Sequence, residues 1–364
     1  MTRDPRPTAG DSGGHGRVTS RQVAAAAGVS QATVSNVINR PDVVAPETRE
    51  RVLAAIGELG FVLNEAARQL RAGHSATLGI CVPDISNPFW AEVTQGAESA
   101  AADQGFVLVI CSSDQSVDKE GRLLHVLEAQ RVAGVLTSPA TSDLSPLLNL
   151  AERGTPVVLL DQRDPTRRLP FVAVDDLFGA RCVGEHLFRL GHRRVAVVNG
   201  PHSVPWCAER WEGMRQAAHQ QGLDPDRALV ELTVPELKAA HGERAVPALL
   251  EGERPTAVFC TNDLVALGVL RGLTQHGLAV PHDISLVGYD DDEFAELLSP
   301  PLTTVRQEPF HLGHSAVELL LQTGADLGGS AERRGQPGLV LPPKLVVRES
   351  TARVRRLPGA SSGG

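Results

Sequence analysis

The stretch VTSRQVAAAAGVSQATVSNVIN, residues 18–39, predicts two short helices joined by a tight glycine turn. Thr19, with Gln22 three residues later, forms a capping box for the first helix, and Ser30 is placed to cap the second. Gly28 lets the chain turn tightly between them, where a side chain would clash. Apolar residues recur at helical spacing and give each helix one inward face. These residues are Val23, Ala24 and Ala27 in the first helix and Val34, Val37 and Ile38 in the second.

The outward face of the second helix carries small or amide side chains, namely Gln31, Ala32, Ser35 and Asn36. Such a nearly uncharged surface suits close approach to the base edges of duplex DNA, with charge supplied from the flanks. The same pattern would also fit a generic small helical subdomain. Because the caps, the turn glycine and the apolar spacing agree over the whole segment, they favour an all-α helix-turn-helix DNA-binding head over about residues 17–63.

A third amphipathic helix is expected over about residues 47–59 as the packing partner of the first two. Its apolar residues are Val52, Leu53, Ile56 and Leu59.

These residues resemble the DNA-binding head of the lactose/galactose-repressor family of bacterial transcription regulators. The resemblance runs through TVSNVIN (33–39), TRERVLAAIGELGF (48–61) and NEAARQLR (64–71), and it continues through almost all of the remaining chain. Two positions depart from the family pattern. Ala45 stands where the family has a capping serine, which leaves Pro46 as the start signal of the third helix, and Leu63 replaces a proline.

The resemblance implies a homodimer that reads a palindromic operator in double-stranded DNA with two heads in adjacent major grooves. The base-reading positions of this sequence are then Gln31, Ala32 and Asn36, and amide side chains pair best with adenine. The hydroxyls or capped backbone amides of four further residues are expected to contact phosphates. These four are Thr19, Ser30, Thr33 and Ser35.

Residues 64–75 correspond to the hinge of the family, which becomes helical when two copies meet on DNA. Eight residues cannot sustain a helix alone in water, so the segment needs that partner. Leu70 matches the leucine that wedges into the minor groove, and Asn64, Ala67 and Arg68 are further expected DNA contacts. A plain interdomain linker is the alternative interpretation of this segment.

The formal net charge of −8 is divided unevenly along the chain. Residues 1–74 hold nine arginines and seven acidic residues, whereas the remainder holds 26 basic and 36 acidic residues. The positive field therefore belongs to the head. Since it is modest, we expect non-specific DNA binding to be weak and sensitive to salt.

The five cysteines are scattered through apolar stretches without a CxxC pair, which indicates buried free thiols in a reducing compartment. No apolar run reaches membrane-spanning length, and the N-terminus lacks the hydrophobic stretch of a signal peptide. We therefore expect a cytoplasmic protein with no membrane partner. Residues 1–16, rich in Pro, Gly, Ser and Thr, are expected to form a disordered extension, and residues 351–364 a flexible tail.

From Ala76 onward, apolar strands alternate with stretches of helical periodicity, which predicts an α/β core of parallel sheets covered by helices. The expected strands are 77–82, 106–111, 134–137, 156–160, 171–174, 194–198, 256–260 and 284–288. These are too many for one simple sheet.

The resemblance implies that residues 76–350 form two doubly wound parallel-sheet subdomains of the periplasmic-binding-protein type. The first would comprise about 76–174 and 308–338, and the second about 175–304 and 339–350. The chain would then cross between them three times, which suits hinge bending.

Ligands of such folds bind beyond the carboxyl ends of the strands, so the residues that follow each strand are candidate contacts. Aromatic faces, carboxylates, amides and one arginine suit a polyhydroxylated small molecule, because carboxylates accept hydroxyl hydrogen bonds and arginine donates a fixed fork. We expect a carbohydrate effector. The candidate effector-binding residues are Phe89, Trp90, Ser138, Asp161, Trp206, Arg210, Asn262, Asp290 and Gln307, of which Arg210 matches the family's effector-binding arginine.

Two further side chains near these positions are expected to be structural. Asp263 is expected to cap the following helix and Trp211 to belong to the core. The identity of the effector stays open, because VPEL (234–237) lacks the aromatic residue that several family members place over the cleft.

No pattern in the chain indicates catalysis, a cofactor or a metal site. Phosphate-binding glycine motifs and a GxSxG elbow are absent, and His311 and His314 stand without a third ligand nearby in sequence. A sugar-modifying enzyme would need catalytic groups that cannot be located. A solute-binding receptor of a transport system would share the core but would need export and would have no use for the head. The sequence therefore favours a DNA-binding transcriptional regulator, a repressor whose operator affinity is controlled allosterically by a small molecule between the subdomains.

Overall fold

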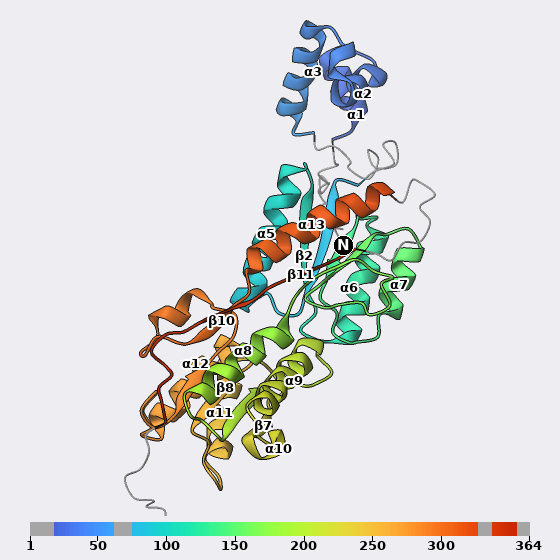
Figure 1. Ribbon diagram of the computed structural model, residues 1–364. Coiled ribbons are helices and arrows are strands. Elements are labelled where there is room, and N and C mark those ends of the chain that lie inside the picture. The colour runs from blue at the N-terminus through green and yellow to red at the C-terminus, as the bar shows by residue number, and fades with distance from the viewer. Residues whose placement is uncertain (1–17, 62–74, 327–336, 355–364) are drawn as a thin grey trace, which may run out of the picture. The chain divides into compact units, whose positions relative to one another are not determined.

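The computed structural model describes residues 18–61, 75–326 and 337–354, and the chain divides into two compact units, 1–74 and 75–364 (Figure 1). The expected N-terminal extension lies outside the described residues. So do the hinge positions Asn64, Ala67, Arg68 and Leu70. None of the helices within the described ranges is both long and apolar enough to cross a membrane.

The first unit contains the predicted helix-turn-helix. Its helices are α1 (Ser20–Ala27), α2 (Gln31–Asn39) and α3 (Pro46–Leu59), with the 3-10 turn η1 (Pro41–Val43) between the last two. The capping box of Thr19 and Gln22 is present, and the Ser30 hydroxyl accepts the Thr33 N–H at 3.0 Å. Gly28 adopts a φ of 64°, which closes the turn. Each of these local predictions is confirmed.

The packing face of α3 was predicted only in part. Val52 and Ala55 are buried and Ile56 packs beside them, so the inward stripe follows the i, i+3, i+4 rule. Leu53 lies off that stripe and is 49% exposed, and Leu59, in the last turn, is 38% exposed. The prediction that these two leucines pack inward was wrong. The helix begins at Pro46 without a side-chain cap from Ala45, as expected.

The first sheet of the second unit has six parallel strands in the order β11-β5-β4-β3-β1-β2. Helices α5 and α13 share one hydrophobic cluster with one face of this sheet, and α6 and α7 share another with the opposite face. The strands are β1 (Thr77–Val82), β2 (Val107–Ser112), β3 (Val135–Thr137), β4 (Val157–Leu160), β5 (Phe171–Val174) and β11 (Gly338–Leu341), and the helices are α5 (Pro88–Asp103), α6 (Val117–Ala129), α7 (Ser145–Glu152) and α13 (Pro309–Asp326).

The second sheet has four parallel strands in the order β7-β6-β8-β9. Helices α8 and α9 cover one face, and α11 and α12 cover the other. The strands are β6 (Val195–Asn199), β7 (Leu229–Thr233), β8 (Ala257–Cys260) and β9 (Ser285–Val287), and the helices are α8 (Asp176–Arg189), α9 (Pro205–Gln220), α10 (Pro225–Ala228), α11 (Ala239–Leu249), α12 (Asp263–Gln275) and the 3-10 helix η2 (Glu293–Leu297). A separate antiparallel pair joins β10 (Thr304–Arg306) to β12 (Lys344–Val346).

The predicted fold class, two parallel-sheet subdomains covered by helices, is confirmed. All eight expected strands form, each within two residues of its predicted bounds, whereas β7, β10, β11 and β12 were not predicted. The chain crosses between the subdomains after β5, after β10 and after β11. One boundary differs from expectation, because β11 pairs with β5 in the register Gly338↔Phe171 and thereby adds residues 339–341 to the first subdomain.

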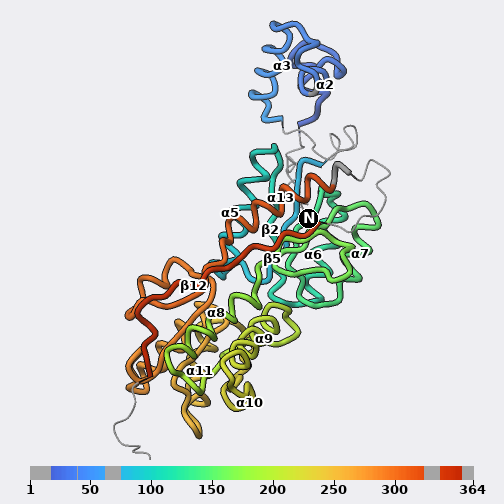
Figure 2. The backbone as a smooth tube through the Cα atoms, viewed as in Figure 1, coloured from blue at the N-terminus to red at the C-terminus, as the bar shows by residue number. Residues whose placement is uncertain are grey.

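The C-terminal segment 337–354 runs alongside first one subdomain and then the other (Figure 2). Residues 351–354, which were expected to belong to a flexible tail, are bound to the second subdomain. The Ala352 N–H donates to the Ser285 hydroxyl at 3.0 Å, and the Val354 N–H donates to the Leu190 carbonyl at 3.1 Å. All five cysteines are free thiols; Cys81, Cys207 and Cys260 are buried, and Cys111 and Cys182 are half-buried.

Candidate DNA-binding face and ligand cleft

The predicted base-reading residues Gln31, Ala32 and Asn36 are exposed on α2. Neither the first turn nor the last turn of this helix carries a charged side chain, so its outer surface is neutral. Among the predicted phosphate contacts, Thr19 and Ser30 are exposed at the N-caps of α1 and α2, and Thr33 and Ser35 are half-buried. The head therefore presents an uncharged helix whose N-terminus, like that of α1, has a side-chain cap.

The larger cavity of the second unit has a volume of about 510 Å³ and is lined by both subdomains. It lies beyond the carboxyl ends of β1, β2 and β3 on one side and of β6 and β7 on the other, where the topology predicts a ligand. The first subdomain contributes Pro83, Asp84, Asn87, Trp90, Asp114, Gln115 and Ala140, and the second contributes Pro201, Ser203, Val204, Trp206, Pro235, Glu236, Leu237 and Lys238.

A smaller cavity of about 290 Å³ lies beyond β4 and β5 and shares Trp206 with the larger one. It is rich in ionisable side chains. Its lining is Ser142, Leu144, Asp161, Gln162, Arg163, Pro165, Ala173, Val174, Asp176, Pro205, Trp206 and Glu209.

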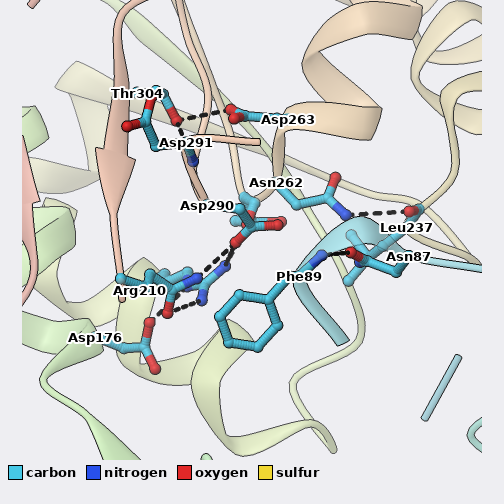
Figure 3. Close-up of polar contacts among 12 residues, drawn as sticks. Asn87, Phe89, Asp176, Arg210, Leu237, Asn262, Asp263, Asp290, Asp291 and Thr304 are labelled. Atoms are coloured by element: carbon cyan, nitrogen blue, oxygen red, sulfur yellow. Dashed lines mark hydrogen bonds and ion pairs between the residues drawn. The ribbon is translucent and has the colours of Figure 1, made fainter. Parts of the chain in front are cut away.

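Arg210 is buried at the centre of a polar network in the second subdomain (Figure 3). Its Nε donates to Asp176 Oδ1 at 2.8 Å, and its Nη1 donates to the carbonyl oxygen of Thr261. The guanidinium carbon lies 4.6 Å from the centroid of the Trp206 ring and 3.7 Å from that of Tyr289. The guanidinium is thus held by a carboxylate, a carbonyl and two aromatic rings.

Asp290 and Gln307 complete this network. The Gln307 amide donates to Asp290 Oδ1 at 2.6 Å and accepts from Arg210 Nη2 at 3.4 Å, while Asp290 Oδ1 lies 3.9 Å from Arg210 Nη1. Asp290 has a φ of 116°, a conformation that side chains rarely adopt. The network therefore links α9 to the loops after β9 and β10.

Asn262, rather than Asp263, is the N-cap of α12, which corrects the prediction. The Asn262 amide oxygen accepts the Val265 N–H at 2.8 Å, and its amide nitrogen donates to the Leu237 carbonyl at 3.1 Å (Figure 3). Asp263 is the first residue of the helix, and its carboxylate accepts from the Thr304 hydroxyl at 2.7 Å. Asp263 therefore has a structural role, as predicted, but as a hydrogen-bond acceptor for Thr304 and not as a helix cap.

Electrostatics in and around the smaller cavity are dominated by burial. Burial raises the pKa of Asp161 to about 8, with the charge of Asp176 adding to it, and the same two causes raise the pKa of Glu209 to about 7. Burial alone would lower the pKa of Arg210, but the surrounding carboxylates, Asp176 first among them, raise it overall.

The predicted effector-binding residues fall into three groups. Trp90 and Trp206 line the larger cavity, and Asp161 and Trp206 line the smaller one. Arg210, Asn262, Asp290 and Gln307 are buried in hydrogen-bond networks and line neither, and Phe89 and Ser138 are buried without lining either. Trp211 packs against the core of the second subdomain, as predicted.

Several polar residues of the larger cavity were not predicted. They are Asp84, Asn87, Asp114, Gln115, Ser203, Glu236 and Lys238. The sequence did contain a signal for two of them, because Asp84 and Asp114 each follow a predicted strand by two or three residues, where ligand contacts are expected. Asp176, the partner of Arg210, had the same signal, because it follows the predicted strand 171–174 by two residues, and it was also missed. Among the described residues, no group of three or more His, Cys, Asp or Glu side chains is arranged to hold a metal ion.

Known proteins resemble both units. Residues 19–64 match the bacterial regulatory proteins of the lacI family, and residues 185–351 match the periplasmic binding protein-like domain. The transcriptional regulator DegA of Bacillus subtilis is 32% identical over 339 residues, which is 92% of this chain and 98% of that protein.

Two solved structures are similar over 92% of this chain. The lac repressor dimer bound to operator and the anti-inducer ONPF matches with a TM-score of 0.80 and 32% identity over 99% of that chain. The complex of the transcriptional regulator CelR with cellobiose matches with a TM-score of 0.68 and 33% identity over 100% of that chain.

The fold and the site together define a DNA-binding transcriptional regulator with a separate ligand-binding core. The chain belongs to the lacI family of bacterial regulatory proteins.

Proposed function

We propose that this regulator is a homodimeric repressor of a palindromic operator, and that a carbohydrate bound between its core subdomains controls its affinity for DNA. The observation that carries the proposal is the cavity of about 510 Å³, to which each subdomain contributes one tryptophan. Its volume falls within the range of small-molecule sites, about 300–1,000 Å³. The cellobiose bound by CelR supports a carbohydrate as the class of ligand.

On the DNA side, Gln31, Ala32 and Asn36 contact base edges in the major groove, because they occupy the exposed face of α2. Thr19, Ser30, Thr33 and Ser35 position the head on phosphates through hydroxyls and helix N-termini. The hinge, with Asn64, Ala67, Arg68 and Leu70, binds and bends the central minor groove.

On the ligand side, Trp90, Trp206 and Asp161 are exposed to the cavities and contact the effector directly. Arg210, Asp290 and Gln307 form a network that begins at the Trp206 ring and ends at the loops before α13. A ligand that moves this ring therefore shifts the positions of the two subdomains. It can change operator affinity only as far as it binds the two arrangements unequally, and a 100-fold change corresponds to about 3 kcal/mol.

An exposed apolar surface on the first subdomain supports the homodimer. Along the edge strand β2, Val107, Val109 and Ile110 are 66%, 40% and 49% exposed, and on α6 Val117 and Val126 are each 53% exposed. Exposed apolar side chains that form a patch on a protein surface mark an interaction site. A second copy of the chain is the expected occupant, since the similar lac repressor structure is a dimer.

The test is operator binding by the purified full-length protein, with the operator selected from random duplexes and binding followed by fluorescence anisotropy. We expect a symmetric site, an affinity that falls steeply with salt, and a change of at least tenfold when an effector sugar is added. Sugar binding without affinity for any palindrome at low salt would instead favour a solute-binding receptor.

A further inference from the structure

The larger and the smaller cavity share one side chain. Trp206, which is 9% exposed, is the residue that lines both the larger cavity and the smaller one. The neighbouring residues Val204 and Pro205 also divide between them, the first on the larger cavity and the second on the smaller. The Trp206 side chain is therefore a wall that the two cavities have in common.

The smaller cavity contains an acceptor and a donor that lack hydrogen-bond partners within the described part of the chain. Asp161 is 5% exposed, and its buried Oδ1 makes no hydrogen bond. The buried Nε of Arg163 also makes none, while its Nη2 lies 3.2 Å from Asp175 Oδ1. Buried polar groups are normally satisfied, so both atoms point to a ligand that can accept and donate.

The charges around these atoms select the chemistry of that ligand. An anion would suit Arg163 but would lie beside the carboxyl groups of Asp161 and Glu209. A cation would suit the carboxyl groups but would be repelled by Arg163. A hydroxyl group both donates and accepts, so an uncharged polyol satisfies both orphaned atoms at once.

The larger cavity also disfavours an anion. Asp84, Asp114 and Glu236 line it together with a single cation, Lys238, and that lysine already pairs with Glu236 at 2.9 Å. A phosphate or carboxylate group would enter a site whose fixed charge is of its own sign.

We propose that the effector is an uncharged oligosaccharide, with sugar units in both cavities and a linkage that passes the Trp206 ring. This inference rests on the proposed function and deepens it, because it names the ligand class of the same cleft. It assigns the smaller cavity, with Asp161 and Arg163, as a second sugar subsite.

The test is calorimetric titration of the full-length protein with matched series of probes: glucose, maltose and maltotriose; glucose, cellobiose and cellotriose; xylose and xylobiose; and glucose 6-phosphate. We expect at least one disaccharide or trisaccharide to bind at least tenfold more tightly than its monosaccharide, and the phosphorylated sugar to bind no more tightly than glucose. The inference is overturned if no oligosaccharide binds, if a monosaccharide binds as tightly as its oligomers, or if glucose 6-phosphate is preferred.

Two variants test the smaller cavity itself. Ser142→Trp fills it from an exposed loop position, and it should weaken the oligosaccharide at least tenfold while leaving the monosaccharide affinity unchanged. Asp161→Asn exchanges an acceptor for a donor at a φ of 52° that asparagine tolerates, and it should also weaken the oligosaccharide at least tenfold.

Trp211→Phe is the matched control, because Trp211 lies on the same helix as Trp206 but lines neither cavity. Equal losses for oligosaccharide and monosaccharide in Ser142→Trp would overturn the second subsite. Operator binding in the same samples separates this inference from the proposed function. Operator binding that responds to some other ligand leaves the regulator intact and rejects only the oligosaccharide.

Discussion

The guanidinium carbon of Arg210 lies 4.6 Å from the centroid of the Trp206 ring, and that ring borders the larger and the smaller cavity described above. The contact joins the proposed ligand surface to a buried network. Arg210 is bonded to Asp176 and Gln307, which come from α8 and from the crossing after β10. A displacement of the ring is therefore transmitted to two of the three segments that connect the subdomains, those after β5 and after β10.

Replacing Trp206 by alanine should weaken effector binding at least tenfold, because a sugar loses its aromatic contact and Arg210 loses one of its two rings. Operator affinity without effector should change less than threefold. Anisotropy titrations with operator and with effector measure both quantities. Trp211→Phe is the control, and equal effects of the two variants would assign Trp206 to general packing.

Replacing Asp290 by asparagine should abolish the response of operator binding to effector. The change removes a carboxylate that accepts from Gln307 at 2.6 Å and lies near the buried Arg210. We expect a cost of about 1–3 kcal/mol in unfolding free energy, since a buried charge loses part of its compensation. Urea unfolding and effector titration test the two effects separately. A variant that still responds fully to effector would make Asp290 a purely structural residue.

The pKa of Asp161, raised to about 8 from an ordinary 3.8, predicts how stability depends on pH. The folded protein keeps a proton that the unfolded chain releases between about pH 4 and 8. This contribution is therefore fully present below pH 3.8 and is lost as the pH rises through about 8. The slope is at most about 1.4 kcal/mol per pH unit for one proton.

Asp161→Asn should flatten the fall in unfolding free energy between pH 6 and 8.5, as followed by urea unfolding at a series of pH values. Contributions with other origins cancel in the comparison with the wild type. Glu209, with a pKa raised to about 7, acts in the same direction and remains in the variant. An unchanged slope would mean that Asp161 titrates normally in the folded protein.

Replacing Ile110 by aspartate should convert the dimer to monomers and lower operator affinity at least tenfold. Ile110 is 49% exposed on the edge strand β2, where a charge would be buried against the second copy. Light scattering gives the oligomeric state. Val347→Asp, at a position 57% exposed outside this surface, is the control. If the Ile110→Asp variant remains a dimer, the dimer interface lies elsewhere on the protein.

Replacing Asn36 by alanine should reduce discrimination against a mismatched base pair by about 1–3 kcal/mol without changing the salt dependence of binding. Asn36 is exposed on α2 and carries no charge. Competition with single-base operator variants measures the discrimination. A uniform loss of affinity across all operators would reassign Asn36 to backbone contacts.

The head was predicted in detail because its signals are local. The caps at Thr19 and Ser30 and the turn at Gly28 each depend on residues within a few positions, whereas the exposure of Leu53 depends on which stripe of α3 meets the other helices. In the core, the strands that consist of an apolar run were predicted correctly, apart from β11. Even β3 and β9, with three residues each, were predicted because they lie in apolar runs, whereas β7, β10 and β12 were missed because they contain Glu231, Arg306 and Lys344.

The sequence predicted which residues lie at the candidate site more reliably than it predicted what each of them does there. The strand-end rule correctly led to Trp90, Asp161 and Trp206, which line the cavities. It did not predict that Arg210 would be enclosed, because its partner Asp176 lies 34 residues earlier and nothing in the sequence pairs the two. Asn262 and Asp263 are both good caps, so the choice between them depends on the tertiary partner Thr304.

The last strands of the chain close both subdomains: β11 forms the outer edge of the first sheet, and β12 holds β10 beside the second. A polypeptide released from the ribosome before residue 338 would have a finished operator-reading head but two unfinished lobes. Because the proposed pairing surface belongs to one of those lobes, such a fragment should not dimerise or compete with intact repressor for its genes. We therefore expect a chain truncated before residue 338 to bind the operator poorly and to show no response to effector.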